Sequence, residues 1–249
     1  MATAADSQAR ILPLSARSEV AQRTLEFRFP KPGSLTFKAG QFMDLTLLDP
    51  AETDAEENTR GFSINSAPDE PELVFTTRLR DTAFKRVLRS MPLGTAVQID
   101  GPFGNFTLHS KESRQAVLLA GGIGITPFRS FVRRAAREKL AHRILLFYAN
   151  RRPEDAPFLD ELYGLERENR RFTFVPTMTR MHDSNASWTG ETGRIDPGMI
   201  LRHTRRSAAA TSAVYYIAGP PRMVAGLHSI VSSLGIDEDD IRIEDFAGY

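Results

Sequence analysis

Alternating apolar and polar positions dominate the first half of the chain. In QRTLEFRF (22–29), Leu25, Phe27 and Phe29 fall on one side, which predicts a half-buried strand. Similar runs, separated by turn sequences rich in Pro, Gly and Asp, predict further strands at 42–48, 61–64, 72–79 and 95–100. Within this half only 81–90 has the spacing of a helix, so we expect a small antiparallel β-barrel.

The second half alternates short apolar runs with segments of helical spacing. The predicted strands are 116–122, 144–150, 172–180, 212–219 and 240–246, and the predicted helices are 126–139, 155–168 and 220–235. This order predicts an α/β domain with a doubly wound parallel sheet. Because the pattern changes near 109–115, we predict a barrel domain at 8–110 and an α/β domain at 111–249.

Composition narrows the classes of function. The 249 residues carry a net charge of +1, which gives no sign of a nucleic-acid partner, and the acidic run 49–58 is read as a solvated loop. Since the chain has no cysteine, disulfides, thiolate zinc sites and cysteine-ligated iron–sulfur clusters are excluded within it. The five histidines lack a paired ligand spacing, so no metal site is expected. No apolar signal core or membrane span is found, and a cytoplasmic location is expected.

The glycine cluster AGGIGITP (120–127) joins the first predicted parallel strand to a helix. Ligands of open parallel sheets bind beyond the carboxyl ends of the strands, and glycines let a backbone approach a pyrophosphate at a helix N-terminus. We expect Thr126 to cap this helix and Pro127 to lie in its first turn. From these residues alone, a plain tight turn between strand and helix stays equally open.

Six segments, taken together, resemble motifs of the ferredoxin–NADP reductase superfamily and occur in that family's order. They are FKAGQF (37–42), RGFSI (60–64), GPFGNF (101–106), AGGIGITP (120–127), AGPPRMV (218–224) and IEDF (243–246). The resemblance covers about residues 35 to 249. It implies a flavin-binding antiparallel barrel followed by a nicotinamide-binding α/β domain, without an iron–sulfur domain.

The resemblance also implies a flavin site. Arg60 matches the arginine that binds the flavin pyrophosphate, and Ser63 matches a serine near flavin N5. Phe62 takes the place of a tyrosine that stacks on the flavin, without its hydroxyl. The helix that starts near Thr82 is expected to face the pyrophosphate, although RDTAFKRVL replaces the family's usual Gly-x-x-Ser. The remaining expected flavin contacts are Ile64, Thr77, Arg80, Phe84, Phe246 and Tyr249. FAD is preferred over FMN because it is more frequent in the family.

The expected nicotinamide site has a catalytic part and a binding part. Ser63, Glu244 and Phe246 are the expected catalytic residues; Phe246 would cover the flavin face that the nicotinamide approaches. Ala218 stands where the family usually has a cysteine. The expected dinucleotide contacts are Gly121, Gly122, Gly124, Thr126, Pro127, Gly219, Pro220 and Met223.

Four arginines bear on the choice between NADPH and NADH. Arg151 and Arg152 follow the second parallel strand, and Arg180 and Arg194 resemble arginines that face a 2′-phosphate in bacterial members. NADPH is therefore preferred, while the acidic pair at 154–155 keeps NADH open.

The function that the resemblance implies is an FAD-dependent NAD(P)H oxidoreductase. A hydride would pass from NAD(P)H to flavin N5, and electrons would then pass to a ferredoxin, a flavodoxin or a small-molecule acceptor. Two alternatives remain: a reductase of free flavin, quinone or ferric iron, and a non-catalytic electron-transfer subunit of a larger complex.

Overall fold

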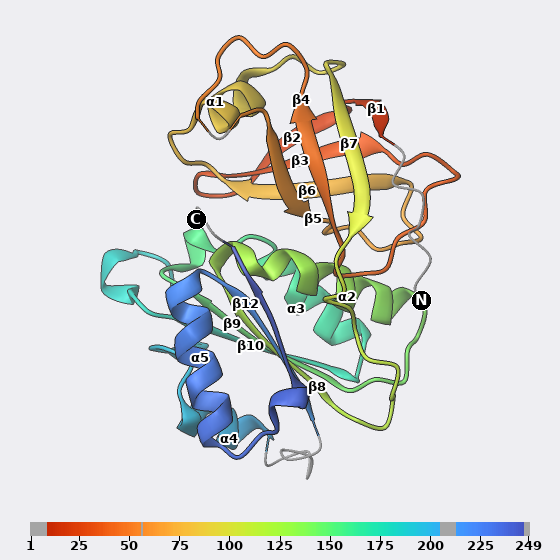
Figure 1. Cartoon of the computed structure of the whole chain (residues 1–249). Coiled ribbons are helices and arrows are strands. Elements are labelled where there is room, and N and C mark those ends of the chain that lie inside the picture. The colour runs from red at the N-terminus through yellow and green to blue at the C-terminus, as the bar shows by residue number, and fades with distance from the viewer. Residues whose placement is uncertain (1–8, 56, 205–212, 247–249) are drawn as a thin grey trace.

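The computed structural model describes residues 9–55, 57–204 and 213–246. Its amino-terminal part consists of two antiparallel sheets with the strand orders β1-β7-β4-β5 and β2-β3-β6 (Figure 1). The strands are β1 (Arg10–Pro13), β2 (Ala16–Ala21), β3 (Thr24–Pro30), β4 (Phe42–Leu47), β5 (Thr59–Ser63), β6 (Glu72–Arg78) and β7 (Ala96–Phe103).

The apolar positions of these strands fill the barrel. Phe27 and Phe29 on β3 and Met43 and Leu45 on β4 are buried in one shared core, as the alternation predicts. Helix α1 (Ala83–Ser90) packs Phe84 and Leu88 against the same core. Thr82 is the residue that caps α1, because its Oγ1 accepts a hydrogen bond from the Lys85 amide.

The carboxyl-terminal part is built on a sheet in the order β11-β10-β9-β8-β12-β13, and all of its pairs are parallel. Its strands are β8 (Ala116–Gly121), β9 (Ile144–Asn150), β10 (Phe172–Met178), β11 (Glu191–Thr192), β12 (Val214–Gly219) and β13 (Ile241–Asp245). Both faces are covered, which explains why β8 reads as a continuous apolar run.

Helices lie on both faces of this sheet. On the face toward the barrel, α2 (Ile125–Arg137) and α3 (Leu159–Glu168) pack against Leu118 and Leu146 (Figure 1). On the other face, α4 (Pro197–Thr204) and α5 (Pro221–Ser233) pack against Leu119 and Leu145. Odd and even positions of each central strand thus point to different helices.

Helix α2 also joins the barrel to the parallel sheet. Arg129 donates to the carbonyl of Asn65 at 3.2 Å, and Ser130 Oγ donates to the carbonyl of Ser66 at 2.6 Å. Arg133 pairs with Glu70 at 2.6 Å. One helix therefore holds the two layers together through buried polar contacts.

The predicted fold class, an antiparallel barrel followed by a doubly wound parallel sheet, is confirmed. The expected strand 172–180 ends at Met178, and β1, β2, β11 and α4 had no counterpart among the expected elements. The division at 110/111 stays a prediction, and residues 8, 56, 205–212 and 247–249 of the expected domains lie outside the described residues.

Candidate functional site

The glycine turn lies at the carboxyl edge of the parallel sheet. Strand β8 ends at Gly121, a 3₁₀ turn spans Gly122–Gly124, and α2 follows directly. A Cβ on Gly124 would lie 2.3 Å from the carbonyl oxygen of Ala218, a contact that backbone atoms cannot relieve. Gly122 has a φ of +53° and open space on its Cβ side. The glycines thus serve both a close approach to β12 and a left-handed turn.

Thr126 does not cap α2, which corrects the expectation. The helix begins at Ile125 with Gly124 as its capping residue, because the 3₁₀ turn runs straight into it. The Thr126 hydroxyl instead donates to the carbonyl of Ile123 at 3.0 Å and is buried. Pro127 lies in the first turn, as expected.

A cleft of about 1070 Å³ opens above this turn. Many of the residues expected to bind the dinucleotide line it: Gly121, Gly122, Arg151, Arg152, Arg194, Pro220 and Met223. Gly124, Thr126, Pro127, Gly219 and Arg180 are not among its lining residues. Arg80, expected at the flavin, lines this cleft as well. The cleft lies where open parallel sheets bind their ligands.

The arginines of the cleft differ in what their side chains contact. Arg152 is held by Asp155 through two hydrogen bonds at 2.9 and 3.0 Å, and it also donates to Gln22. Arg151 and Arg194 are exposed and form no side-chain hydrogen bond or ion pair within the described chain. These two are therefore better placed than Arg152 to receive an anionic ligand.

Sequence reasoning missed further basic residues of this cleft. Arg222 stands at the start of α5, inside the quoted segment AGPPRMV, so its motif was visible although its role was not. Arg23 and Arg78 come from the barrel, and no local signal connects them with the glycine turn. Only the packing of the barrel against the sheet brings them there.

Glu244 lies on β13, which is separated by β12 from the strand that precedes the glycine turn. It pairs in register with Ala218, whose carbonyl approaches Gly124. Glu244 Oε2 is buried without a hydrogen-bond partner among the described residues, and burial raises the pKa of the carboxyl to about 7. Phe246 follows, with its amide donating to the carbonyl of Gly219 at 3.1 Å. The end of β13 thus brings a carboxyl group with a raised pKa and an aromatic residue to the same edge of the sheet.

The expected flavin residues gather at the amino end of α1. The guanidinium of Arg60 lies 5.1 Å from the centre of the Phe84 ring and donates to the carbonyls of Glu57 and Thr59 at 3.1 and 2.8 Å. Phe62 is only 4% exposed and packs against Phe84 with ring centres 6.0 Å apart. Its role as a stacking face for a flavin stays a prediction.

The other expected flavin contacts include Ile64, Thr77 and Tyr249. Ile64 and Thr77 are fully buried, and Thr77 Oγ1 donates to the carbonyl of Arg78 at 3.4 Å. Tyr249 lies outside the described residues. Barrel strand β6, which carries Thr77, contacts the glycine turn, so the two halves of the expected site adjoin.

Two observations fit a flavin. Ser63 Oγ is buried and has no hydrogen-bond partner in the described chain, which suits a hydroxyl that serves a polar ring atom. Arg60 and the amides at the start of α1 form a donor set for a phosphate. That donor set already holds an anion, because Asp54 of the acidic run accepts from both. The run is therefore not merely a solvated loop.

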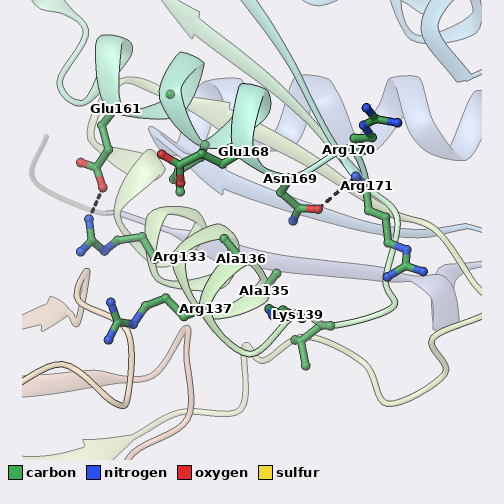
Figure 2. Close-up of a pocket in the computed structure, with 13 residues that line it drawn as sticks. Arg133, Ala135, Ala136, Arg137, Lys139, Glu161, Glu168, Asn169, Arg170 and Arg171 are labelled. Carbon is green, nitrogen blue, oxygen red and sulfur yellow. Dashed lines mark hydrogen bonds and ion pairs between the residues drawn. The ribbon is translucent and has the colours of Figure 1, made fainter.

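A second cavity, of about 930 Å³, lies between the carboxyl ends of α2 and α3 (Figure 2). None of the expected site residues lines it. Two of its basic residues are already paired: Arg133 with Glu161, which also lines the cavity, and with Glu70, and Arg137 with Asp69. This groove therefore plays no part in the candidate site.

Neither a metal-binding cluster nor a membrane-spanning helix is found in the parts of the chain that the structure describes. No group of three or more His, Cys, Asp or Glu side chains there is placed to hold a metal ion. None of the helices described is long and apolar enough to cross a membrane.

Comparisons with known proteins agree with this geometry. Residues 118–229 match the profile of the oxidoreductase NAD-binding domain family. Over 227 residues the chain is 28% identical to ferredoxin–NADP reductase B of Sorangium cellulosum, with 89% of this chain and 90% of the relative covered. The resemblance to the ferredoxin–NADP reductase superfamily that the sequence motifs indicate is confirmed. The predicted class, a flavin-dependent oxidoreductase that uses FAD and NAD(P)H, is that of the superfamily.

Two further matches are a solved structure with the same fold and a curated relative that is longer than this chain. A crystal structure of a Neisseria gonorrhoeae ferredoxin–NADP⁺ reductase with FAD and NADP superposes with a TM-score of 0.78 at 22% identity, covering 96% of this chain and 99% of that one. One component of the Na⁺-translocating NADH-quinone reductase of Serratia proteamaculans is 26% identical over 205 residues, which are 78% of this chain and 50% of that component. The chain spans half or less of the first curated relatives it matches.

Proposed function

We propose that this chain is an FAD-dependent reductase that takes a hydride from NADPH and passes electrons to a separate acceptor. The observation that carries the proposal is the arginine-lined cleft above the glycine turn. Glu244 lies outside the lining of this cleft, on β13, where it pairs in register with Ala218. The class of reaction is inferred from the superfamily, and the preference for NADPH is inferred from the arginines of the cleft.

The glycine turn and its neighbours position the dinucleotide. The exposed face of Gly122 and the start of α2 offer backbone amides to a pyrophosphate. The buried contacts between Gly124 and Ala218 keep the turn against β12, so the nicotinamide end is directed toward the edge that carries Glu244. A bound flavin would accept the hydride there, and the protein contributes the geometry that holds the two rings together.

Glu244 is proposed to hold and exchange a proton beside the reacting rings. A carboxyl with a pKa of about 7 is populated in both forms near neutral pH, which suits a group that releases and regains a proton in each cycle. Because Oε2 has no protein partner among the described residues, the carboxyl is open to a hydrogen bond from a ligand.

The preference for NADPH rests on Arg151 and Arg194, with Arg222 as an addition. A 2′-phosphate needs charge-assisted hydrogen bonds, and these arginines face the cleft without an ion-pair partner in the described chain. Of the acidic pair that kept NADH open, Asp155 is engaged by Arg152, and Glu154 accepts a hydrogen bond from Ser184. Asp155 is therefore less available to a ribose hydroxyl of NADH.

The acceptor is proposed to be a ferredoxin, a flavodoxin or a small molecule, and the location to be cytoplasmic. A second function is favoured by the relatives from the Na⁺-translocating NADH-quinone reductases: the chain would be the NADH-oxidising reductase module of a larger complex. A reductase of free flavin, quinone or ferric iron remains a third. Turnover with ferredoxin, ferricyanide and quinones, compared with the two coenzymes, separates these candidates.

The test of the proposed function is an absorbance spectrum of the purified chain followed by anaerobic titration. A flavin spectrum bleached by NADPH at lower concentration than by NADH is the expected result. A chain that neither contains flavin nor takes it up would end the proposal, and equal bleaching by both coenzymes would remove the NADPH preference.

A further inference from the structure

Asp54 occupies the position where an anionic ligand of α1 would lie. Its Oδ2 accepts a hydrogen bond from the amide of Ala83, the first residue of α1, at 3.0 Å. Its Oδ1 accepts from Arg60 Nη2 at 3.2 Å. The carboxylate thus connects the positive end of the helix with the guanidinium, as a phosphate oxygen pair would.

The segment that carries Asp54 is fastened to the same helix. Glu52 accepts hydrogen bonds from Arg86 of α1 at 2.7 to 3.2 Å, and Arg86 also pairs with Asp81. Arg60 is held from the other side by two carbonyls of the residues that precede it. The segment 50–55 therefore lies over the start of α1 in a defined position.

A flavin phosphate and Asp54 need the same donors. Arg60 is the residue assigned to the flavin pyrophosphate, and the start of α1 is its expected second partner. A carboxylate and a negatively charged phosphate cannot share them, because like charges at this distance repel each other. Binding of a phosphorylated flavin at Arg60 hence requires that Asp54 leave, and the contacts of Asp54 oppose that binding.

We propose that Asp54 is an internal anion that competes with the phosphate end of the flavin and lowers the affinity of the chain for FAD and FMN relative to riboflavin. The inference rests on the proposed function, since it requires a flavin whose phosphate approaches Arg60. Its consequence is a flavin that exchanges more readily than the bare Arg60 and α1 donors would allow. Asp54 is thus a residue that sets flavin selectivity.

The test measures dissociation constants of three flavins by fluorescence quenching, on the full chain with any bound flavin removed. Asp54→Ala and Asp54→Asn both remove the competing charge. We expect each to lower the dissociation constants of FAD and FMN by about tenfold, the size of one charge-assisted hydrogen bond. Riboflavin, which has no phosphate, should bind as it does to the unaltered chain.

Asp49→Asn is the matched control. It removes the same charge from the same acidic run, and asparagine tolerates the positive φ of 44° at this position. A general electrostatic effect would shift FAD affinity equally in both variants, and that result would overturn the proposal. Unchanged or weaker FAD binding in both Asp54 variants would overturn it too, while leaving the flavin assignment intact.

The two proposals fail differently. If no flavin, riboflavin included, binds to the unaltered chain or to either Asp54 variant, the flavin assignment fails and the inference fails with it. If riboflavin binds to the unaltered chain and to both Asp54 variants, but the variants prefer FAD over riboflavin no more than the unaltered chain does, only the inference fails. Thermal melting of each variant confirms that the chains compared are folded.

Discussion

Arg129 of α2 lies 3.5 Å from the carboxylate of Glu26 on β3, and both side chains are almost completely buried. The same guanidinium donates to Glu161 on α3 at 2.9 Å and stacks 4.3 Å from the ring centre of Phe158. A charge buried between two layers is stable only while its partners remain, so this contact fixes how α2 meets the barrel.

Replacing Arg129 with methionine should therefore destabilise the chain. The variant keeps the aliphatic volume but leaves Glu26 with Arg28 as its remaining ionic partner. We expect a loss of about 3 kcal/mol in the free energy of unfolding, measured by urea denaturation. Arg134→Met is the control, because among the described residues Arg134 pairs with Glu138 alone, one turn along α2, and its loss should cost less than about 0.5 kcal/mol. Equal losses in the two variants would refute a structural role for the buried pair.

Glu244 should make stability depend on pH. Its pKa of about 7 in the folded chain lies above the ordinary 4.5, so the folded state binds the proton more tightly than the unfolded state. The stabilisation is complete below about pH 4.5 and is lost as the pH rises through 7, by at most about 3 kcal/mol. Glu244→Gln should remove this dependence and be the more stable chain at pH 8. If the stability of the two chains depends on pH in the same way, Glu244 is not the group responsible for this dependence.

The same substitution should alter catalysis. If Glu244 exchanges a proton beside the reacting rings, the unaltered chain should show a turnover profile with an apparent pKa near 7. Glu244→Gln should lower turnover and flatten that part of the profile, while coenzyme affinity changes little. Steady-state rates from pH 5.5 to 9 provide the measurement; an unmoved inflection would assign it to another group.

Arg151 and Arg180 give a matched test of coenzyme choice. Arg151 lines the cleft, whereas Arg180 precedes a 3₁₀ turn and does not line it. Arg151→Ala should raise the KM for NADPH by about tenfold or more and leave the KM for NADH nearly unchanged. Arg180→Ala should have the smaller effect. An equal rise with both coenzymes in the Arg151 variant would argue against a contact with the 2′-phosphate.

The glycine turn offers a pair of alanine substitutions with different outcomes. Gly124→Ala places a methyl group 2.3 Å from the Ala218 carbonyl and should cost about 3 kcal/mol, because backbone must move. Gly122→Ala meets open space and should cost only about 1 kcal/mol for its left-handed conformation. Thermal melting distinguishes them, and similar melting temperatures would mean that the turn can leave β12.

The central elements of the fold could be predicted because one interaction, the burial of apolar side chains, sets the pattern of their sequences. Strand β8 is apolar throughout because both of its faces are covered by apolar side chains. Strand β3 alternates although Thr24 and Glu26 on its second face are also buried, because Glu26 is paired with arginines there. The missed strands β1 and β2 lie at sheet edges, and β2 has no fully buried residue. Nothing in such a segment separates a strand from a loop.

The candidate site was predictable where a motif carries its own geometry. The glycine turn and Glu244 lie together because adjacent parallel strands end at one edge. The contact of Asp54 with Arg60 was not visible, because an acidic run has the same composition whether it is solvated or bound to a helix. The position of Thr126 depended on a 3₁₀ turn that the pattern does not encode.

Helix α2 has one end in the glycine turn and its middle on the barrel. Exchange of the α/β half between relatives would therefore transplant the nucleotide turn together with the residues that orient it. In a chimera joined near residue 110, the incoming α2 would set the angle between the barrel and the parallel sheet. Such a chimera needs partners for Arg129 and Ser130 on the recipient barrel before it can align two cofactors.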